Sequence, residues 1–100
     1  MLKKDLLELC LLQLLEGGDR YGYELLRQLH AAFPDTQEST IYAILRGLCR
    51  QGHTEHYRGE SSGGPARKYY RLTCAGQVRR EELLTQWRML CAALVQMGVK

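Results

Sequence analysis

The chain has 100 residues, of which 45% are hydrophobic and 25% are charged, and its formal net charge is +3. These values are ordinary for one small globular domain, and they argue against a globally disordered chain. No apolar run approaches the length of about 18 residues that a membrane-spanning helix needs, so we expect none.

The first predicted helix covers residues 2–16 and is apolar almost all round. One apolar stripe is widened by a second set of leucines: Leu6, Leu9, Cys10 and Leu14, then Leu7, Leu11, Leu12 and Leu15. A helix this apolar must bury two faces. We therefore expect its second face to meet another subunit, and we expect Gly17 and Gly18 to end the helix.

Two further helices are predicted over residues 21–33 and 36–50, separated by Pro34-Asp35. The core stripe of the later helix has the spacing i, i+3, i+4, i+7: Ile41, Ile44, Leu45 and Leu48. Its opposite face carries a small polar residue, a tyrosine, an alanine and two arginines: Ser39, Tyr42, Ala43, Arg46 and Arg50. Such a face suits a groove lined with phosphates, and backbone N–H groups at the helix start add affinity for anions.

A β-hairpin is predicted next, with strands over residues 53–58 and 67–72. The segment GESSGGPA between them is glycine-rich and too long for a two-residue turn, which predicts a long, mobile tip. Tyr69 and Tyr70 alternate along the second strand, so one faces the core and the other solvent, and the pattern leaves open which. Arg67 and Lys68 lie at the edge of the tip, where they would contact phosphates or a narrow minor groove.

The last predicted helix covers about residues 73–97, with Thr73 as its N-cap. Its apolar residues follow a heptad spacing, widened by three neighbours: Leu83, Trp87, Leu90, Leu94 and Met97, then Leu84, Cys91 and Val95. The preceding helices and hairpin already make a small core, which leaves this helix little to pack against within one chain. Dimerisation is the preferred interpretation, and folding back on its own domain is the alternative.

The charge is unevenly distributed along the chain. Residues 1–45 balance at −3, residues 46–80 at +6 and residues 81–100 at zero. This asymmetry is typical of an anion-facing middle segment, and a solvated basic face is the alternative. Three helices followed by a hairpin is the order of a winged helix-turn-helix. We therefore predict a mostly α fold with a small β-hairpin, in which residues 1–72 bind DNA and residues 73–100 form a dimerisation helix, as one compact unit.

Three segments resemble the signature segments of the PadR-like transcriptional regulators: YGYELLRQL (21–29), STIYAILRGLCRQG (39–52) and GGPARKYYRLTCAG (63–76). The resemblance runs from about Leu6 to Trp87 and is closest to the short type with a single C-terminal helix. It implies a dimeric repressor in which the C-terminal helix and the first helix form the subunit interface. It also implies a response to phenolic or other aromatic, drug-like compounds.

The resemblance also assigns residues to roles. Thr40 and Tyr42 match a T-x-Y pattern at the start of the DNA-reading helix, and Arg46 matches a frequent cation there. The wing matches at Arg67, Lys68 and Tyr69, and Trp87 matches an aromatic position that faces the dimer centre. In two places the sequence departs from the pattern. Ala43 replaces a common proline, which would alter sequence preference, and His53-Thr54 replaces the usual apolar pair at the start of the wing, which changes the expected packing there.

The candidate sites are therefore these. The predicted DNA-binding residues are Ser39, Thr40, Tyr42, Ala43, Arg46, Arg50, Arg67, Lys68 and Tyr69. The predicted effector site contains Trp87, Leu90 and Cys91. The predicted dimer interface contains Leu6, Leu9, Leu83, Trp87, Leu90 and Leu94. The expected partners are double-stranded DNA with an inverted repeat, a second copy of the chain and a planar aromatic molecule.

Other classes of function fit less well. No nucleophile–base–acid set is present, so we expect no enzyme, and we expect no cofactor. His53 and His56 point to opposite faces of a strand, so we expect no metal site. Asp5, Glu8 and Gln13 interrupt the N-terminal leucines, so we do not expect these leucines to form a secretory signal peptide. Without such a signal, and with no C-x-x-C pair, the cysteines are expected to be free thiols in the cytoplasm. The alternative function is a winged-helix module that binds an acidic protein and has no effector.

Overall fold

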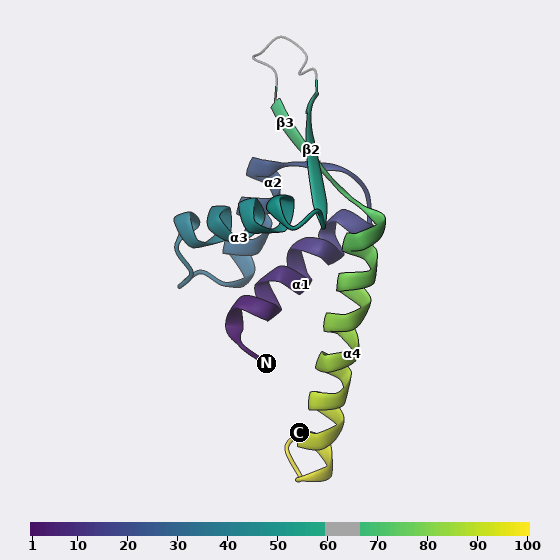
Figure 1. Ribbon diagram of the computed structural model, residues 1–100. Helices are drawn as coiled ribbons and strands as arrows, with labels where there is room; N and C mark the ends of the chain where they lie inside the picture. Colours follow the sequence, from purple (N-terminus) through teal and green to yellow (C-terminus); the bar gives the residue numbers. More distant parts are fainter. Residues whose placement is uncertain (60–66) are drawn as a thin grey trace.

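The chain forms four helices and three short strands in the computed structural model, which describes residues 1–59 and 67–100 (Figure 1). In chain order these are α1 (Lys3–Glu16), β1 (Arg20–Tyr21), α2 (Gly22–Ala32), α3 (Glu38–Arg50), β2 (Thr54–Gly59), β3 (Arg67–Leu72) and α4 (Cys74–Gln96). The predicted winged-helix fold is confirmed. The predicted mobile tip lies outside the described residues, apart from Gly59.

The wing is a three-stranded antiparallel sheet with the order β1-β3-β2, rather than the two-stranded hairpin predicted. β2 and β3 pair from Thr54 opposite Leu72 to Gly59 opposite Arg67. The extra strand β1 is only two residues long, and it places Tyr21 opposite Tyr69. A segment this short has no alternating pattern, so only its pairing with a distant strand identifies it.

α1 is the central helix of the chain and contacts α2, α3, β3 and α4. Four of its leucines are buried in the core: Leu7, Leu11, Leu12 and Leu15. The core is completed by the leucines of α2, the predicted stripe of α3, Tyr70 and Leu83. The surplus apolar surface of α1 was predicted to meet a second subunit, but α4 of the same chain already packs against this helix.

The first half of α4 belongs to the core of its own chain. Leu83, predicted at a dimer interface, is instead fully buried there. Two polar contacts hold the same half of the helix on α1. Arg79 pairs with the buried carboxylate of Glu8 at 3.4 Å, and Arg80 donates a hydrogen bond from Nη1 to Oε1 of Gln13 at 2.9 Å. The alternative of folding back on the domain therefore describes this part of α4.

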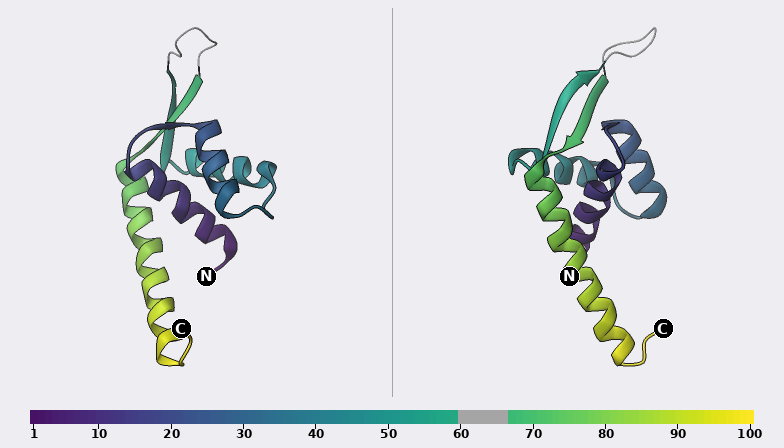
Figure 2. Two further views of the ribbon diagram at one scale, coloured as in Figure 1. Left: turned by 180° about the vertical axis from the view of Figure 1, so that it is seen from behind. Right: turned by 90° about the vertical axis from the view of Figure 1, so that its right-hand side faces the viewer.

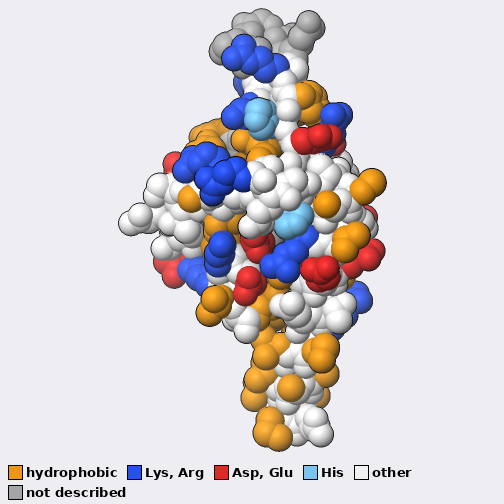
Figure 3. Space-filling view, in the orientation of Figure 1, with side chains coloured by type: hydrophobic (Ala, Val, Ile, Leu, Met, Phe, Trp, Pro, Cys, Tyr) orange, Lys and Arg blue, Asp and Glu red, His pale blue; other side chains and the backbone are white. Residues whose placement is uncertain are grey.

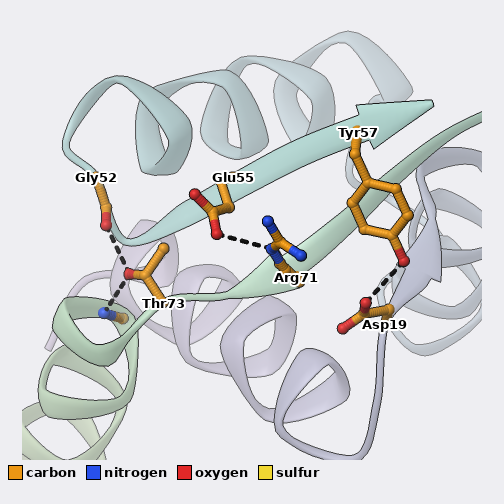
Figure 4. A network of polar contacts seen from close by, with 7 residues as sticks. Asp19, Gly52, Glu55, Tyr57, Arg71 and Thr73 are labelled. Atoms are coloured by element: carbon orange, nitrogen blue, oxygen red, sulfur yellow. Dashed lines mark hydrogen bonds and ion pairs between the residues drawn. The ribbon is translucent and has the colours of Figure 1, made fainter.

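The start of α4 is fixed to the turn that precedes β2 (Figure 4). As predicted, Thr73 is the N-cap, and its Oγ1 accepts a hydrogen bond from the backbone N–H of Gly76 at 3.0 Å. The same hydroxyl donates to the carbonyl of Gly52 at 2.6 Å. A Cβ atom on Gly76 would overlap the carbonyl oxygen of His53. Glycine is therefore required at this position because the backbone of another segment passes directly beside it.

The two polar residues at the start of the wing, His53 and Thr54, are held by different hydrogen bonds. Thr54 is fully buried, and its Oγ1 lies 3.1 Å from Sγ of Cys49 at the end of α3. The hydroxyl is thus satisfied inside the core, where an unpaired one would be destabilising. His53 is held through its backbone, since its N–H donates to the carbonyl of Leu48 and its carbonyl accepts from Thr73.

The molecule is elongated, with extents of 54 × 30 × 21 Å and a radius of gyration of 15.0 Å. A compact chain of this length would have a radius of gyration of about 13 Å. The wing projects at one end and the second half of α4 at the other, beyond the body of the molecule (Figure 2). Among the described residues, no helix is both long and apolar enough to cross a membrane.

Candidate nucleic-acid interface

α3 lies at the surface of the molecule with one side exposed to solvent. Its buried side is the predicted stripe: Ile41, Ile44, Leu45 and Leu48. The exposed side carries the residues predicted to bind DNA from this helix: Ser39, Thr40, Ala43, Arg46 and Arg50, with Tyr42 half-buried. The chain folds this way because the apolar spacing matches the helical repeat, which leaves the polar residues on the other side.

The start of β3 presents the two predicted wing cations. Arg67 and Lys68 are exposed, whereas Tyr69 is half-buried and Tyr70 is the tyrosine that faces the core. The ring of Tyr69 lies over Gly59 on the neighbouring strand, where a Cβ atom would overlap it. Gly59 therefore leaves room for the ring of Tyr69, the residue that follows the two cations in the sequence, to pack against the wing.

A hollow of about 650 Å³ lies between α3 and the wing, and we call it the wing-side hollow. Its lining comes from β1, α2, α3 and β3: Tyr21, Gly22, Tyr23, Tyr42, Arg46, Arg67, Lys68 and Tyr70. It brings together four of the predicted DNA-binding residues, which are distant in the sequence. Lys and Arg side chains gather in this region in the space-filling view (Figure 3).

A second hollow of about 850 Å³ lies on the other flank of α3, against the start of α1. Its lining includes the remaining predicted residues of α3, Ser39, Thr40, Ala43 and Arg50, together with Lys3, Lys4 and Glu8 of α1 and the nearby Asp35. Lys3 lies 3.7 Å from the carboxylate of Asp35, and both side chains are well exposed. The exposed side of α3 is therefore a ridge with a cation-containing hollow on each flank.

The cations beside α3 differ in their partners from those further down the wing. Arg71 on the wing forms a 2.7 Å ion pair with Glu55, and this pairing raises the pKa of its guanidinium (Figure 4). Within residues 1–59 and 67–100, no carboxylate forms an ion pair with Arg46, Arg67 or Lys68. These three positive charges are therefore not neutralised by any carboxylate in the described part of the chain.

Two tyrosines of this region, Tyr57 and Tyr70, stay uncharged near neutral pH. The hydroxyl of Tyr57 donates a 2.7 Å hydrogen bond to Asp19, and this bond raises the pKa of the phenol (Figure 4). Burial raises the pKa of Tyr70. Because an ordinary tyrosine has a pKa of about 10, neither phenol adds a negative charge that would offset the cations.

The chain that forms this surface, an exposed helix beside a cationic wing, also matches a known protein family in its sequence. The model of the PadR-like family of transcriptional regulators matches residues 11–82. The chain belongs to this family. As a PadR-family protein it is a transcriptional regulator that binds DNA.

Solved structures agree with this assignment. A Streptococcus transcriptional regulator is similar with a TM-score of 0.84 and 34% identity, covering 95% of this chain and 94% of that one. A PadR-like regulator from Bacillus cereus has a TM-score of 0.82 and 32% identity, with 92% and 90% covered. A PadR family regulator from Clostridium difficile has a TM-score of 0.80 and 28% identity, with 91% and 96% covered. A protein from Lysinibacillus sphaericus is 34% identical over 84 residues, which cover 81% of this chain and 77% of that protein.

In this PadR-family chain, sequence reasoning assigned no role to two tyrosines and two lysines that line the hollows. Tyr21 and Tyr23 belong to the quoted YGYELLRQL segment, but only the folded chain places them beside the wing cations. Lys3 and Lys4 belong to the first helix and lie beside α3. The sequence shows these two positive charges, but the net charge of residues 1–45 is −3, so the charge distribution along the chain gives no sign of a cationic surface beside α3.

The predicted effector residues, together with Leu94 of the predicted dimer interface, lie on the projecting half of α4. Trp87, Leu90 and Leu94 are 39%, 37% and 41% exposed, and Cys91 is half-buried. Hydrophobic side chains cover much of this half of the helix (Figure 3). Leu6 and Leu9 of α1 are half-buried. Apart from Leu83, the predicted dimer residues thus retain apolar surface that a second PadR-family chain could cover.

Proposed function

We propose that this PadR-family regulator is a cytoplasmic homodimeric repressor that binds an inverted-repeat operator and is released from it by a planar aromatic effector. The observation that carries the DNA part is the exposed ridge of α3, with Arg46, Arg67 and Lys68 on the wing side and Lys3 and Lys4 on the other. A major groove is wide enough to admit an α-helix. The hollows on either flank would then lie under the two phosphate backbones that border the groove.

The roles of the α3 residues follow from their chemistry. Ser39, Thr40 and Tyr42 carry hydroxyls that can bind base edges, and Ala43 offers a small apolar contact for a thymine methyl group. Arg46 and Arg50 can bind guanine or phosphate. Because phosphate contacts fix register and base contacts specify sequence, changes at the hydroxyls should alter preference between operators.

The dimer proposal rests on the projecting half of α4. Six large apolar residues of this half are exposed: Trp87, Met89, Leu90, Leu94, Val95 and Met97. Exposed apolar surface concentrated in one place is typical of an interaction site. A second copy of the chain, related by a two-fold axis, would cover it and set two α3 helices about one helical turn of DNA apart. In this proposal residues 1–72 bind DNA and residues 73–100 form the interface.

The effector proposal rests on Trp87, with Leu90 and Cys91 beside it on α4. Two copies of Trp87 near the dimer axis could hold a flat ring between them, and each aromatic pair would contribute about 0.5–1.5 kcal/mol beyond area burial. Such a ligand would change the angle between the paired helices and so the distance between the two α3 helices. The coupling between ligand and DNA would be about 1–3 kcal/mol.

Binding to duplex DNA tests the central part of the proposal. An operator should first be selected from a random-sequence pool and then titrated, beside a nonspecific duplex, at two salt concentrations. We expect tighter binding to an inverted repeat and weaker binding at higher salt. A chain that binds no duplex even at low salt would instead support the protein-binding module.

Fluorescence of Trp87 tests the effector, because it is the only tryptophan in the chain. A panel of planar phenolics and cationic dyes should quench it, and a quenching compound should weaken operator binding. The Leu90→Ala variant, which keeps the fluorophore, should bind the same compound more weakly. Quenching without any change in operator affinity would overturn the relief of repression.

A further inference from the structure

Four tyrosines form a row of ring contacts at the base of the wing, which we call the tyrosine stack; its two end pairs are stacked and its central pair, Tyr21 and Tyr69, is tilted by 55°. Tyr23 of α2 lies 6.4 Å from Tyr21 of β1, which lies 6.0 Å from Tyr69 of β3, and Tyr69 lies 5.8 Å from Tyr57 of β2. These centroid separations are within the range of attractive aromatic pairs. The stack therefore joins the helix-turn-helix to both long strands of the wing.

Among the described residues, three of these four rings have an arginine guanidinium over them, and one of the three arginines lines the wing-side hollow. The guanidinium of Arg67 lies 4.7 Å from the ring centre of Tyr21, closer than Arg71 lies to Tyr57 (5.3 Å) or Arg27 to Tyr23 (5.8 Å). A cation at this distance from a tyrosine face is held by a cation–π interaction. Arg67 and Tyr21 both line the wing-side hollow.

The wing-side hollow has the chemistry of a phosphate site. Its three cations, Arg46, Arg67 and Lys68, come from α3 and from β3 and converge on one space. Carboxylates do not contribute to its described lining, and no ion pair within the described part of the chain engages these cations. A guanidinium can bind a phosphate through two parallel hydrogen bonds, which requires the side chain to have a definite orientation.

We propose that the wing-side hollow binds one backbone phosphate in each operator half-site, and that Tyr21 is a positioning residue that holds Arg67 for this contact. The proposal rests on the DNA-binding function proposed above. The side chain of Arg67 is exposed, and a long exposed side chain populates several rotamers unless a contact restrains it. The ring of Tyr21, which belongs to a different element, supplies that restraint. An arginine already ordered before binding loses less conformational entropy when the phosphate arrives.

A double-mutant cycle tests the positioning role. Arg67→Ala should weaken operator binding about tenfold or more, as loss of a hydrogen-bonded charge does, and should lower the salt slope by about one unit. Tyr21→Leu should weaken binding by about two- to fivefold, while Tyr21→Phe, which keeps the ring face, should remain close to the original chain. In the Arg67→Ala background, Tyr21→Leu should have no further effect.

Tyr57→Leu is the matched control for the Tyr21 variants. It removes a ring from the other end of the same stack, but Tyr57 does not line the hollow and Arg67 does not cover it. It should therefore leave the salt slope of DNA binding unchanged. If Tyr21→Leu and Arg67→Ala weaken binding additively, or if Tyr57→Leu changes binding as much as Tyr21→Leu does, the positioning role is refuted.

Replacing single operator phosphates with uncharged methylphosphonates tests the phosphate site without changing Tyr21. One position in each half-site should weaken binding by the original chain but have little effect on the Arg67→Ala variant. If the original chain binds the operator but every sensitive position affects both proteins equally, the proposed phosphate site is wrong while the DNA-binding function stands. If the original chain fails to bind any duplex, the proposed function itself fails.

Discussion

Replacement of Gly76 with alanine sets local helix propensity against tertiary packing. Gly76 lies in the first turn of α4, where its N–H donates to the Thr73 cap. Propensity alone predicts stabilisation, since alanine is favoured over glycine in a helix by about 1 kcal/mol. The tertiary structure predicts the opposite, because the added methyl group would overlap the carbonyl oxygen of His53.

The size of the effect follows from what must move. The obstacle is backbone rather than the end of a flexible side chain, so the change belongs in the upper part of the overpacking range of about 1–3 kcal/mol. A shift of the His53 carbonyl also weakens the 3.2 Å hydrogen bond that it accepts from Thr73. That bond contributes about 0.5–1.5 kcal/mol. After the propensity gain is subtracted, we expect a net destabilisation of about 2–3 kcal/mol.

Thermal unfolding followed by circular dichroism measures this change. At roughly 4–8 °C per kcal/mol for a domain of this size, the Tm of Gly76→Ala should fall by about 8–24 °C. Gly47→Ala is the matched control in α3, since a Cβ atom there would meet only Nη2 of Arg50 at 3.9 Å. Its Tm should be unchanged or higher. A Tm for Gly76→Ala at or above that of the original chain would refute the packing argument.

Three further predictions concern association, the α1–α4 contact and the thiols. Leu94→Glu would bury an unpaired carboxylate in the proposed interface, so light scattering should show monomers, and an unchanged dimer would contradict that interface. Arg79→Ala leaves the buried Glu8 carboxylate without its partner and should lower the unfolding free energy by about 1–3 kcal/mol in urea, whereas an unchanged midpoint would show that the pair contributes nothing. Burial raises the pKa of Cys10 while Cys74 is exposed, so a disulfide reagent at pH 8 should modify Cys74 first, and the reverse order would contradict the structure.

Much of the fold was visible in the sequence because it depends on local patterns. The helical spacing of Ile41, Ile44, Leu45 and Leu48 identified both the buried and the exposed sides of α3. Thr73 was recognisable as an N-cap, and the strand limits of residues 67–72 were predicted as observed. Each of these features is set by side chains only a few residues apart, whose geometry repeats in every helix or strand.

The features that were missed all depend on contacts between distant segments. β1 exists because Tyr21 pairs with Tyr69, and Leu83 is buried because α4 packs on α1 of the same chain. A heptad spacing shows that a helix has an apolar side, but it does not show whether that side meets its own chain or another. The same limit applied to Tyr69 and Tyr70, whose alternation was clear while the choice of the buried ring was not.

The sequence by itself determined the winged-helix class, the family and the cations that we propose to face DNA, because periodicity, caps and charge are properties of neighbouring residues. Only the tertiary structure decided which of those cations converge. Arg46 and Arg67 are 21 positions apart in the chain, and they line one hollow because β3 pairs with β2, which contacts α3. The requirement for glycine at position 76 also comes from the tertiary structure, because the carbonyl oxygen of His53 leaves no room for a Cβ atom there. Distant segments come together because the whole core packs as one unit, and this cannot be predicted from the pattern of neighbouring residues.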